Sequence, residues 1–162
     1  MRTYTCLTLI ALCGIGQAAE PQGLAPRLSR TDYSVTCFTD GLAVAATLVS
    51  RDQVRLLFGP ELERSYWVVE VGFYSKNHRS YQVSPADFEL RPGRQVRGGV
   101  KPLPAELLSR QLRSSFVRTG ALPDVSTSQA VGGYLFFPIE RTATKLLLDY
   151  VGNGAWLTLP LQ

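Results

Sequence analysis

Alternating hydrophobic and polar residues predict β-strands along most of the chain. The clearest strand covers residues 66–74, because every second position there is apolar while Glu70 and Gly72 fall on the opposite side. The residues expected on its inward face are Trp67, Val69, Val71 and Phe73. This pattern is typical of a strand with one face on a core.

Shorter apolar or alternating runs predict the remaining strands. They lie at residues 33–38, 42–49, 81–83, 86–90, 131–137, 145–150 and 155–159. Asp40-Gly41 and Gly152-Asn153-Gly154 are typical of hairpin turns between strands. Pro85 has no backbone N–H, so we expect the chain to bend there or to run at a sheet edge.

Two short helices are expected among these strands. Ser50 can cap a helix over residues 51–58, and Gly59 and Pro60 are expected to end it. Pro104 suits the first position of a second helix. The apolar side of that helix is predicted, at a spacing of four, from Leu108, Leu112 and Phe116.

Seven or eight strands with two short helical inserts predict a mainly β fold. Strand and helix do not alternate regularly, which argues against a parallel α/β fold. The uneven strand spacing favours an antiparallel sandwich over a closed up-and-down barrel.

Length and composition place the chain among ordinary globular proteins. Its 162 residues suit one domain, and 45% hydrophobic with 19% charged residues excludes a disordered chain. Three cysteines are too few for a disulfide-dense scaffold.

The N-terminus has the pattern of a secretory signal peptide. Arg2 precedes an apolar stretch over residues 6–15, and small residues follow at Ala18 and Ala19. The stretch is far shorter than the roughly 20 residues of a membrane-spanning helix, so we expect no transmembrane span in the mature chain. The predicted organisation is a signal peptide at 1–19, an extended leader at 20–31 and a β-sandwich domain at 32–162. The protein is therefore expected to be exported, either periplasmic or secreted.

Cys13 raises the alternative of lipid attachment within the signal. The large Leu12 precedes it where a lipidation site carries a small residue, so ordinary cleavage is favoured. Cleavage at the end of the signal leaves Cys37 without a second cysteine for an internal disulfide. Its place on a strand face with Tyr33 and Val35 favours a thiol packed in the core over one that joins two chains.

Four segments carry a resemblance to a known kind of domain. They are YWVVEVGFYSKN at 66–77, VSPADFEL at 83–90, GGYLFFPI at 132–139 and KLLLDY at 145–150. Over residues 33–160 the chain resembles the immunoglobulin-like β-sandwich domains of unknown function found in bacterial exported proteins and lipoproteins. The resemblance implies an antiparallel immunoglobulin-like sandwich and an exported, uncharacterised envelope protein. It implies no catalytic residue and no cofactor.

The sequence contains no Gly-x-Ser-x-Gly, no phosphate-binding loop and no His-Glu-x-x-His. The single histidine, His78, stands in a basic turn, where a solvated role is favoured over catalysis or metal binding. Asp87 is expected to cap a turn rather than to bind calcium. We therefore expect a non-enzymatic binding module without a metal or cofactor.

Two alternatives remain open. One is a small envelope hydrolase acting through Asp87, Glu89 or His78. The other is a structural subunit of an envelope assembly, joined to its neighbours through a sheet edge or Cys37.

Aromatic residues offer a further candidate surface. Tyr66 and Tyr74 share the strand face of Glu70 and are the better candidates for an exposed stacking platform. The alternative is that a flanking insert covers this face.

Positive charge is concentrated in one segment. The chain carries a formal net charge of +4, and between residues 91 and 118 the basic residues face Glu106 alone. The candidate anion-binding or partner-binding residues are Arg91, Arg94, Arg97, Lys101, Arg110, Arg113 and Arg118. An acidic envelope polymer, an anionic lipid surface or an envelope protein would fit such a basic insert. The alternative is a solvated excursion. Nucleic acid is not expected, because no nucleic-acid motif accompanies the charge.

The signal pattern predicts a mature N-terminus within a few residues of Glu20. Intact mass measurement of the exported protein checks this. A product that keeps Met1, or one that begins at a lipid-modified Cys13, would contradict the assignment of the first nineteen residues.

Overall fold

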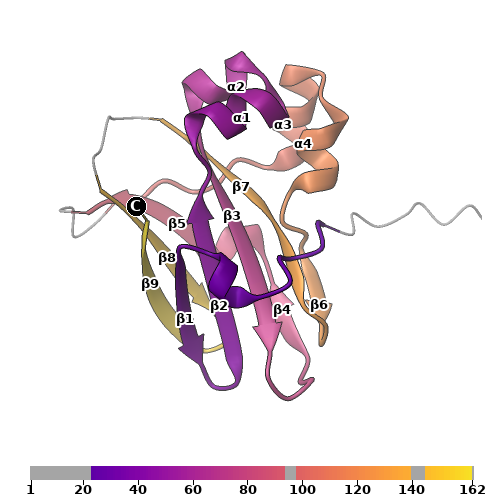
Figure 1. Cartoon of the computed structure of the whole chain (residues 1–162), viewed down its shortest axis with the longest axis vertical. Helices are drawn as coiled ribbons and strands as arrows, with labels where there is room; N and C mark the ends of the chain where they lie inside the picture. Colours follow the sequence, from indigo (N-terminus) through magenta and orange to yellow (C-terminus); the bar gives the residue numbers. More distant parts are fainter. Residues whose placement is uncertain (1–22, 94–97, 140–144, 162) are drawn as a thin grey trace, which may run out of the picture.

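The computed structural model describes residues 23–93, 98–139 and 145–161. Within these ranges two main antiparallel sheets pack face to face, and the helices gather at one end (Figure 1). The prediction of a mainly β antiparallel sandwich with helical inserts is therefore confirmed. The predicted signal at 1–19, with Cys13, lies outside the described residues.

The strands of the described ranges form three sheets. Sheet A has the order β1-β2-β3-β7, sheet B pairs β4 with β6, and sheet C has the order β5-β8-β9. The strand bounds are β1 Val35–Thr39, β2 Leu42–Leu48, β3 Tyr66–Ser75, β4 Tyr81–Val83, β5 Phe88–Pro92, β6 Val125–Thr127, β7 Val131–Pro138, β8 Leu146–Gly152 and β9 Ala155–Leu161. The short β6 was not predicted from the sequence.

The helix predicted over residues 51–58 is confirmed as α1 and is followed by a further short helix, whereas the second predicted helix is divided into two. The pairs are α1 Arg51–Phe58 with α2 Pro60–Ser65, and α3 Ala105–Leu112 with α4 Ser115–Gly120. Ser50 caps α1 as predicted, because its hydroxyl accepts a hydrogen bond from the Gln53 N–H at 3.3 Å. The helix α1 ends at Phe58 with Gly59 as its C-cap, as predicted, and Pro60 then opens α2, where a proline needs no N–H partner.

The second helix differs from its prediction. Arg113 adopts a left-handed conformation with φ 49° and ends α3, so the spacing of four breaks there. In α4 the buried side chain is that of Val117, whereas Phe116 is 40% exposed. The prediction that Phe116 continues the apolar side of one helix was therefore wrong.

The main core lies between sheets A and C. From β3 it receives the inward residues that the alternation predicts, Trp67, Val69, Val71 and Phe73. Phe88, Leu148, Tyr150 and Leu159 face them from sheet C. Between β4 and β5 the chain passes from sheet B to sheet C through a 3-10 turn, Pro85–Asp87, so Pro85 marks a bend as predicted.

The outer face of sheet A is covered as well. At one end, Val68 and its pairing partner Phe136 pack under the helices in a second core with Phe58 and Leu108. At the other end, residues 24–34 cross the sheet from the edge of β7 toward β1, and we call this segment the strap. Strand β3 is consequently buried on both faces.

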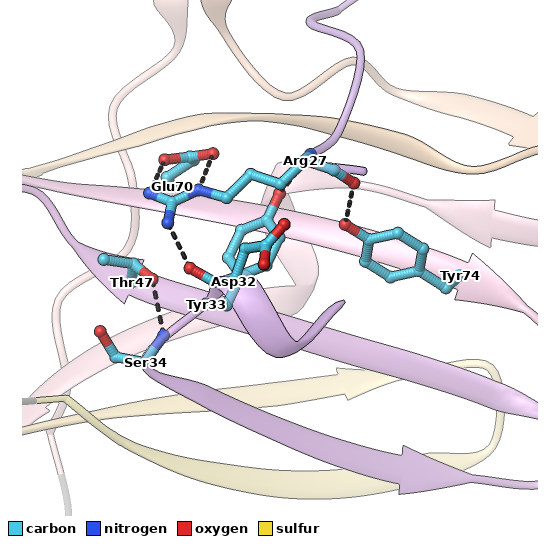
Figure 2. Close-up of polar contacts among 7 residues, drawn as sticks. All are labelled: Arg27, Asp32, Tyr33, Ser34, Thr47, Glu70 and Tyr74. Carbon is cyan, nitrogen blue, oxygen red and sulfur yellow. Dashed lines mark hydrogen bonds and ion pairs between the residues drawn. The ribbon is translucent and has the colours of Figure 1, made fainter. Parts of the chain in front are cut away.

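Polar contacts hold the strap in place (Figure 2). Arg27 donates from Nε and Nη2 to the Glu70 carboxylate at 2.9 and 2.6 Å. The Tyr74 hydroxyl donates to the Arg27 carbonyl at 2.6 Å, and the Ser34 N–H donates to Thr47 Oγ1 at 2.8 Å. Burial raises the pKa of Tyr33, the aromatic residue of the strap.

Two facing glycines let the strap lie flat on the sheet. Gly72 and Gly132 are pairing partners, and neither places a side chain between the sheet and the strap. A Cβ at Gly72 would lie 2.6 Å from the Tyr33 hydroxyl, and one at Gly132 would lie 3.0 Å from Pro26 Cα. Gly132 therefore allows the strap backbone to approach the sheet closely, and Gly72 leaves room for the Tyr33 ring.

Cys37 and Tyr33 do not share a face, although the alternation predicts that they do. A 3-10 turn, η1 (Arg30–Asp32), and a bend precede β1, so Tyr33 lies on the outer face of sheet A. Cys37 packs half-buried against the main core, and its thiol donates to the Thr158 carbonyl at 3.8 Å. Burial raises the pKa of this thiol, which disfavours the reactive thiolate.

We expect Gly72→Ala to lower the free energy of unfolding by about 1–3 kcal/mol, because the new methyl group displaces Tyr33 and lifts the strap. Urea denaturation measures this loss. In a Tyr33→Ala background the same change should be neutral or slightly stabilising, since alanine suits a strand better than glycine. An equal loss in both backgrounds would contradict the proposed packing.

Candidate functional site

A cleft of about 520 Å³ opens beside the edge of β7. Residues 101–106 form one wall and residues 121–124 form the other. Eleven of its seventeen lining residues are aliphatic, phenylalanine or proline. A concave site of this size and apolar character is typical of ligand binding.

Two hydrogen bonds to β7 create the cleft. The Leu103 N–H donates to the Phe136 carbonyl at 2.8 Å, and the Leu122 N–H donates to the Tyr134 carbonyl at 3.0 Å. Each wall thus joins the strand edge at one point, and the two walls separate between those points. Pro102, Pro104 and Pro123 flank the anchor residues and restrict the backbone of both walls.

Charged residues of both signs stand at the cleft. Lys101 and Arg118 supply two positive charges, whereas Glu106 and Asp124 supply two negative charges. All four residues are exposed. The charges lining the cleft therefore sum to zero.

Asp124 fixes one wall to sheet B. Its carboxylate accepts hydrogen bonds from the Ser84 hydroxyl at 3.0 Å and from Gln82 Nε2 at 2.9 Å. Lys101 Nζ donates to the Ala86 carbonyl at 2.9 Å, which ties the other wall to the 3-10 turn. Burial, reinforced by Asp124, raises the pKa of the neighbouring Asp87, and Lys101 opposes that rise.

Tyr134 lies half-buried in the cleft wall, and burial raises the pKa of its phenol. Its hydroxyl is therefore neutral near pH 7 and can act as donor or acceptor toward a ligand. Sequence analysis did not single out Tyr134, Ser84 or Asp124 as site residues. The prolines on both sides of the cleft are the sequence signal that could have pointed to a rigid site.

The structure separates the five predicted basic residues that it describes. Lys101 and Arg118 meet at the cleft, while Arg110 and Arg113 are exposed at the end of α3. Arg91 lies on β5 and pairs with Asp149 of β8. Arg94 and Arg97 lie outside the described residues.

The Arg91 side chain is bound to an acidic residue of the neighbouring strand β8. Its guanidinium donates from Nε and Nη2 to the Asp149 carboxylate, which is only 7% exposed and also accepts from the Thr158 hydroxyl at 2.6 Å. The hydrogen bond to Asp149 raises the pKa of Arg91 further above its usual value.

The other predicted candidates lie away from the cleft. The platform of Tyr66, Tyr74 and Glu70 is not exposed, because the strap binds Tyr74 and Glu70 and Tyr66 packs against the helical core. His78 is exposed in the turn after β3, with φ 52°. Among the described residues, no group of histidine, cysteine, aspartate and glutamate could hold a metal ion.

Comparisons with known proteins find similar folds but indicate no function. No family model matches the chain, and no curated protein matches it in sequence. The yjhA protein from Bacillus subtilis has a similar structure, with 11% identity and a TM-score of 0.50 over 80% of this chain and 96% of that one. At this identity the likeness concerns the fold alone.

A second solved structure, ycdA from Bacillus subtilis, is described as a "putative lipoprotein". It has 14% identity and a TM-score of 0.47, and the match covers 77% of this chain and 37% of that one. The chain thus corresponds to little more than a third of that protein. No helix among the described residues is both long and apolar enough to cross a membrane.

We expect Arg91→Gln to lower the free energy of unfolding by about 3 kcal/mol, because it leaves the buried Asp149 carboxylate without its charged partner. The exposed Arg110→Gln is the matched control and should change stability by less than about 0.5 kcal/mol. Urea midpoints compare the two. Equal midpoints would mean that the Arg91–Asp149 pair does not stabilise sheet C.

Proposed function

We propose that this protein is an exported, non-enzymatic β-sandwich module that binds a partner protein of the cell envelope through the cleft at β7. The N-terminal signal pattern supports a periplasmic or secreted location. The finer likeness to immunoglobulin-like domains of exported proteins and lipoproteins, carried by the four sequence segments, belongs to the same proposal.

The composition of the cleft favours one of the three partner classes. An acidic polymer or an anionic lipid surface would call for an excess of positive charge, but two acidic residues balance Lys101 and Arg118 at this cleft. A polypeptide segment carries apolar side chains together with charges of both signs. It therefore matches apolar walls bordered by both signs of charge.

Size and rigidity agree with a short extended segment. A volume of about 520 Å³ holds a few side chains rather than a folded domain. Both walls are anchored to β7 by backbone hydrogen bonds and stiffened by prolines, so little ordering is needed on binding. In this proposal Lys101 and Arg118 contact acidic groups of the partner, and Arg110 and Arg113 remain solvated.

Peptide selection tests the proposal. A random peptide library is selected on the mature protein, and bound peptides are compared between two variants with the same substitution. Ala86→Trp places an indole at the cleft, whereas Ala130→Trp adds one at an exposed turn outside it. We expect enriched peptides with apolar and acidic residues whose affinity falls at least tenfold in Ala86→Trp and is unchanged in Ala130→Trp.

Charge reversal adds a second comparison. Lys101→Glu should weaken peptides that carry an acidic residue, while Lys76→Glu, in an exposed turn, should not. Salt-dependent binding to phosphatidylglycerol vesicles or to an acidic glycopolymer, with no peptide enriched, would contradict the proposal. So would substrate turnover by the purified protein that is lost in His78→Ala, because this outcome favours the hydrolase.

A further inference from the structure

The outer face of sheet C carries a large exposed aromatic side chain. Trp156 on β9 is 74% exposed, and its pairing partner on β8, Val151, is 57% exposed. Both point away from the core, because Tyr150 on β8 and Leu159 on β9, which lie on the opposite face of the same strands, are fully buried. The indole and the valine therefore form a small apolar surface on a strand pair.

The support beneath this surface is rigid. Asn153 in the β8–β9 turn binds the backbone of Gln82, accepting from its N–H at 2.9 Å and donating to its carbonyl at 2.8 Å. The same amide donates to the Tyr150 hydroxyl at 2.5 Å. The hairpin that presents Trp156 is thus tied to β4, and its geometry is set before any ligand binds.

A row of polar groups lies next to the apolar pair. Glu89, Asp149 and Thr158 occupy adjacent positions across β5, β8 and β9. The Arg91 guanidinium and the Thr158 hydroxyl both bind the Asp149 carboxylate, which fixes their orientation. Two residues along a strand span roughly 6.7 Å, so the polar row lies about one sugar ring away from the indole.

We propose that this face of sheet C binds a neutral oligosaccharide. One face of a sugar ring presents C–H groups that can stack on the Trp156 indole, and the hydroxyl groups at its rim can hydrogen-bond to Thr158 on the same strand. Asp149 compensates the charge of Arg91, so the row does not favour an anionic lipid. The apolar area of Trp156 with Val151 is small for a stable protein interface.

The two tryptophans of the chain allow a direct test. Trp67 is half-buried beside Arg51, and Trp67→Phe leaves Trp156 as the sole tryptophan. We would titrate this variant with cellotetraose, chitotetraose and maltotetraose and follow acrylamide quenching of its fluorescence. At least one tetrasaccharide should protect Trp156 from quenching.

Calorimetry with that tetrasaccharide on the otherwise unchanged chain locates the site. Trp156→Ala should weaken binding at least tenfold with an unchanged melting temperature, because the indole is exposed. Thr158→Val should weaken binding severalfold and lower the melting temperature slightly, because it also removes the hydrogen bond to Asp149. The matched control, Phe38→Ala, removes an exposed aromatic of sheet A and should leave binding unchanged.

Four outcomes would overturn the inference. These are no protection by any of the three sugars up to about 10 mM, equal binding by Trp156→Ala, a sugar affinity that Ala86→Trp abolishes, and a dimer that Trp156→Ala dissociates without any sugar binding. The third would assign the sugar to the cleft, and the fourth would make the face a contact between copies. Peptide binding at the cleft stays independent of all the sheet C variants, so this inference and the proposed function can fail separately.

Discussion

Strand β3 is buried on both faces, and the rest of the molecule is arranged around this constraint. Its inner face meets sheet C across the main core. Its outer face carries the apolar Val68 at one end. At Gly72, toward the other end, no side chain projects from the strand, so the strap can lie directly on the sheet. The helices cover the first region and the strap covers the second, with the Arg27–Glu70 pair as the polar closure. The half-buried Glu70 carboxylate beside the strap is tolerated because the Arg27 guanidinium binds both of its oxygens.

Covering sheet A in two ways also creates the cleft. The edge of β7 is not paired with one continuous strand but with three separate segments, joined at Leu24, Leu122 and Leu103. This protects the edge from pairing with another chain. Because the segments belong to different parts of the fold, their walls diverge and leave a concave surface between them. The cleft is therefore a consequence of how the edge of the sheet is closed.

Charge that is close in sequence is dispersed in space. The basic run from Arg91 to Arg118 crosses from sheet C to the helical end, so its members face different surroundings. Arg91 is held by Asp149, a residue 58 positions away, and Lys101 and Arg118 meet acidic residues at the cleft. Local net charge along the chain did not reveal the Arg91–Asp149 pair, since Asp149 comes from a strand far along the chain.

The sequence by itself determined the described strands other than β6, the hairpins at Asp40-Gly41 and Gly152-Asn153-Gly154, the cap at Ser50 and the inward face of β3. These features depend on side-chain alternation and on local backbone preferences, which neighbouring residues set. Only the tertiary structure decided that the outer face of sheet A is covered and that Arg91 pairs with Asp149. It also decided that Tyr134 and Asp124 line one cleft with Lys101. It also decided that Trp156, on a strand that looks half-buried like the others, stays exposed. Such outcomes depend on contacts between residues far apart in the chain, and no local pattern encodes them.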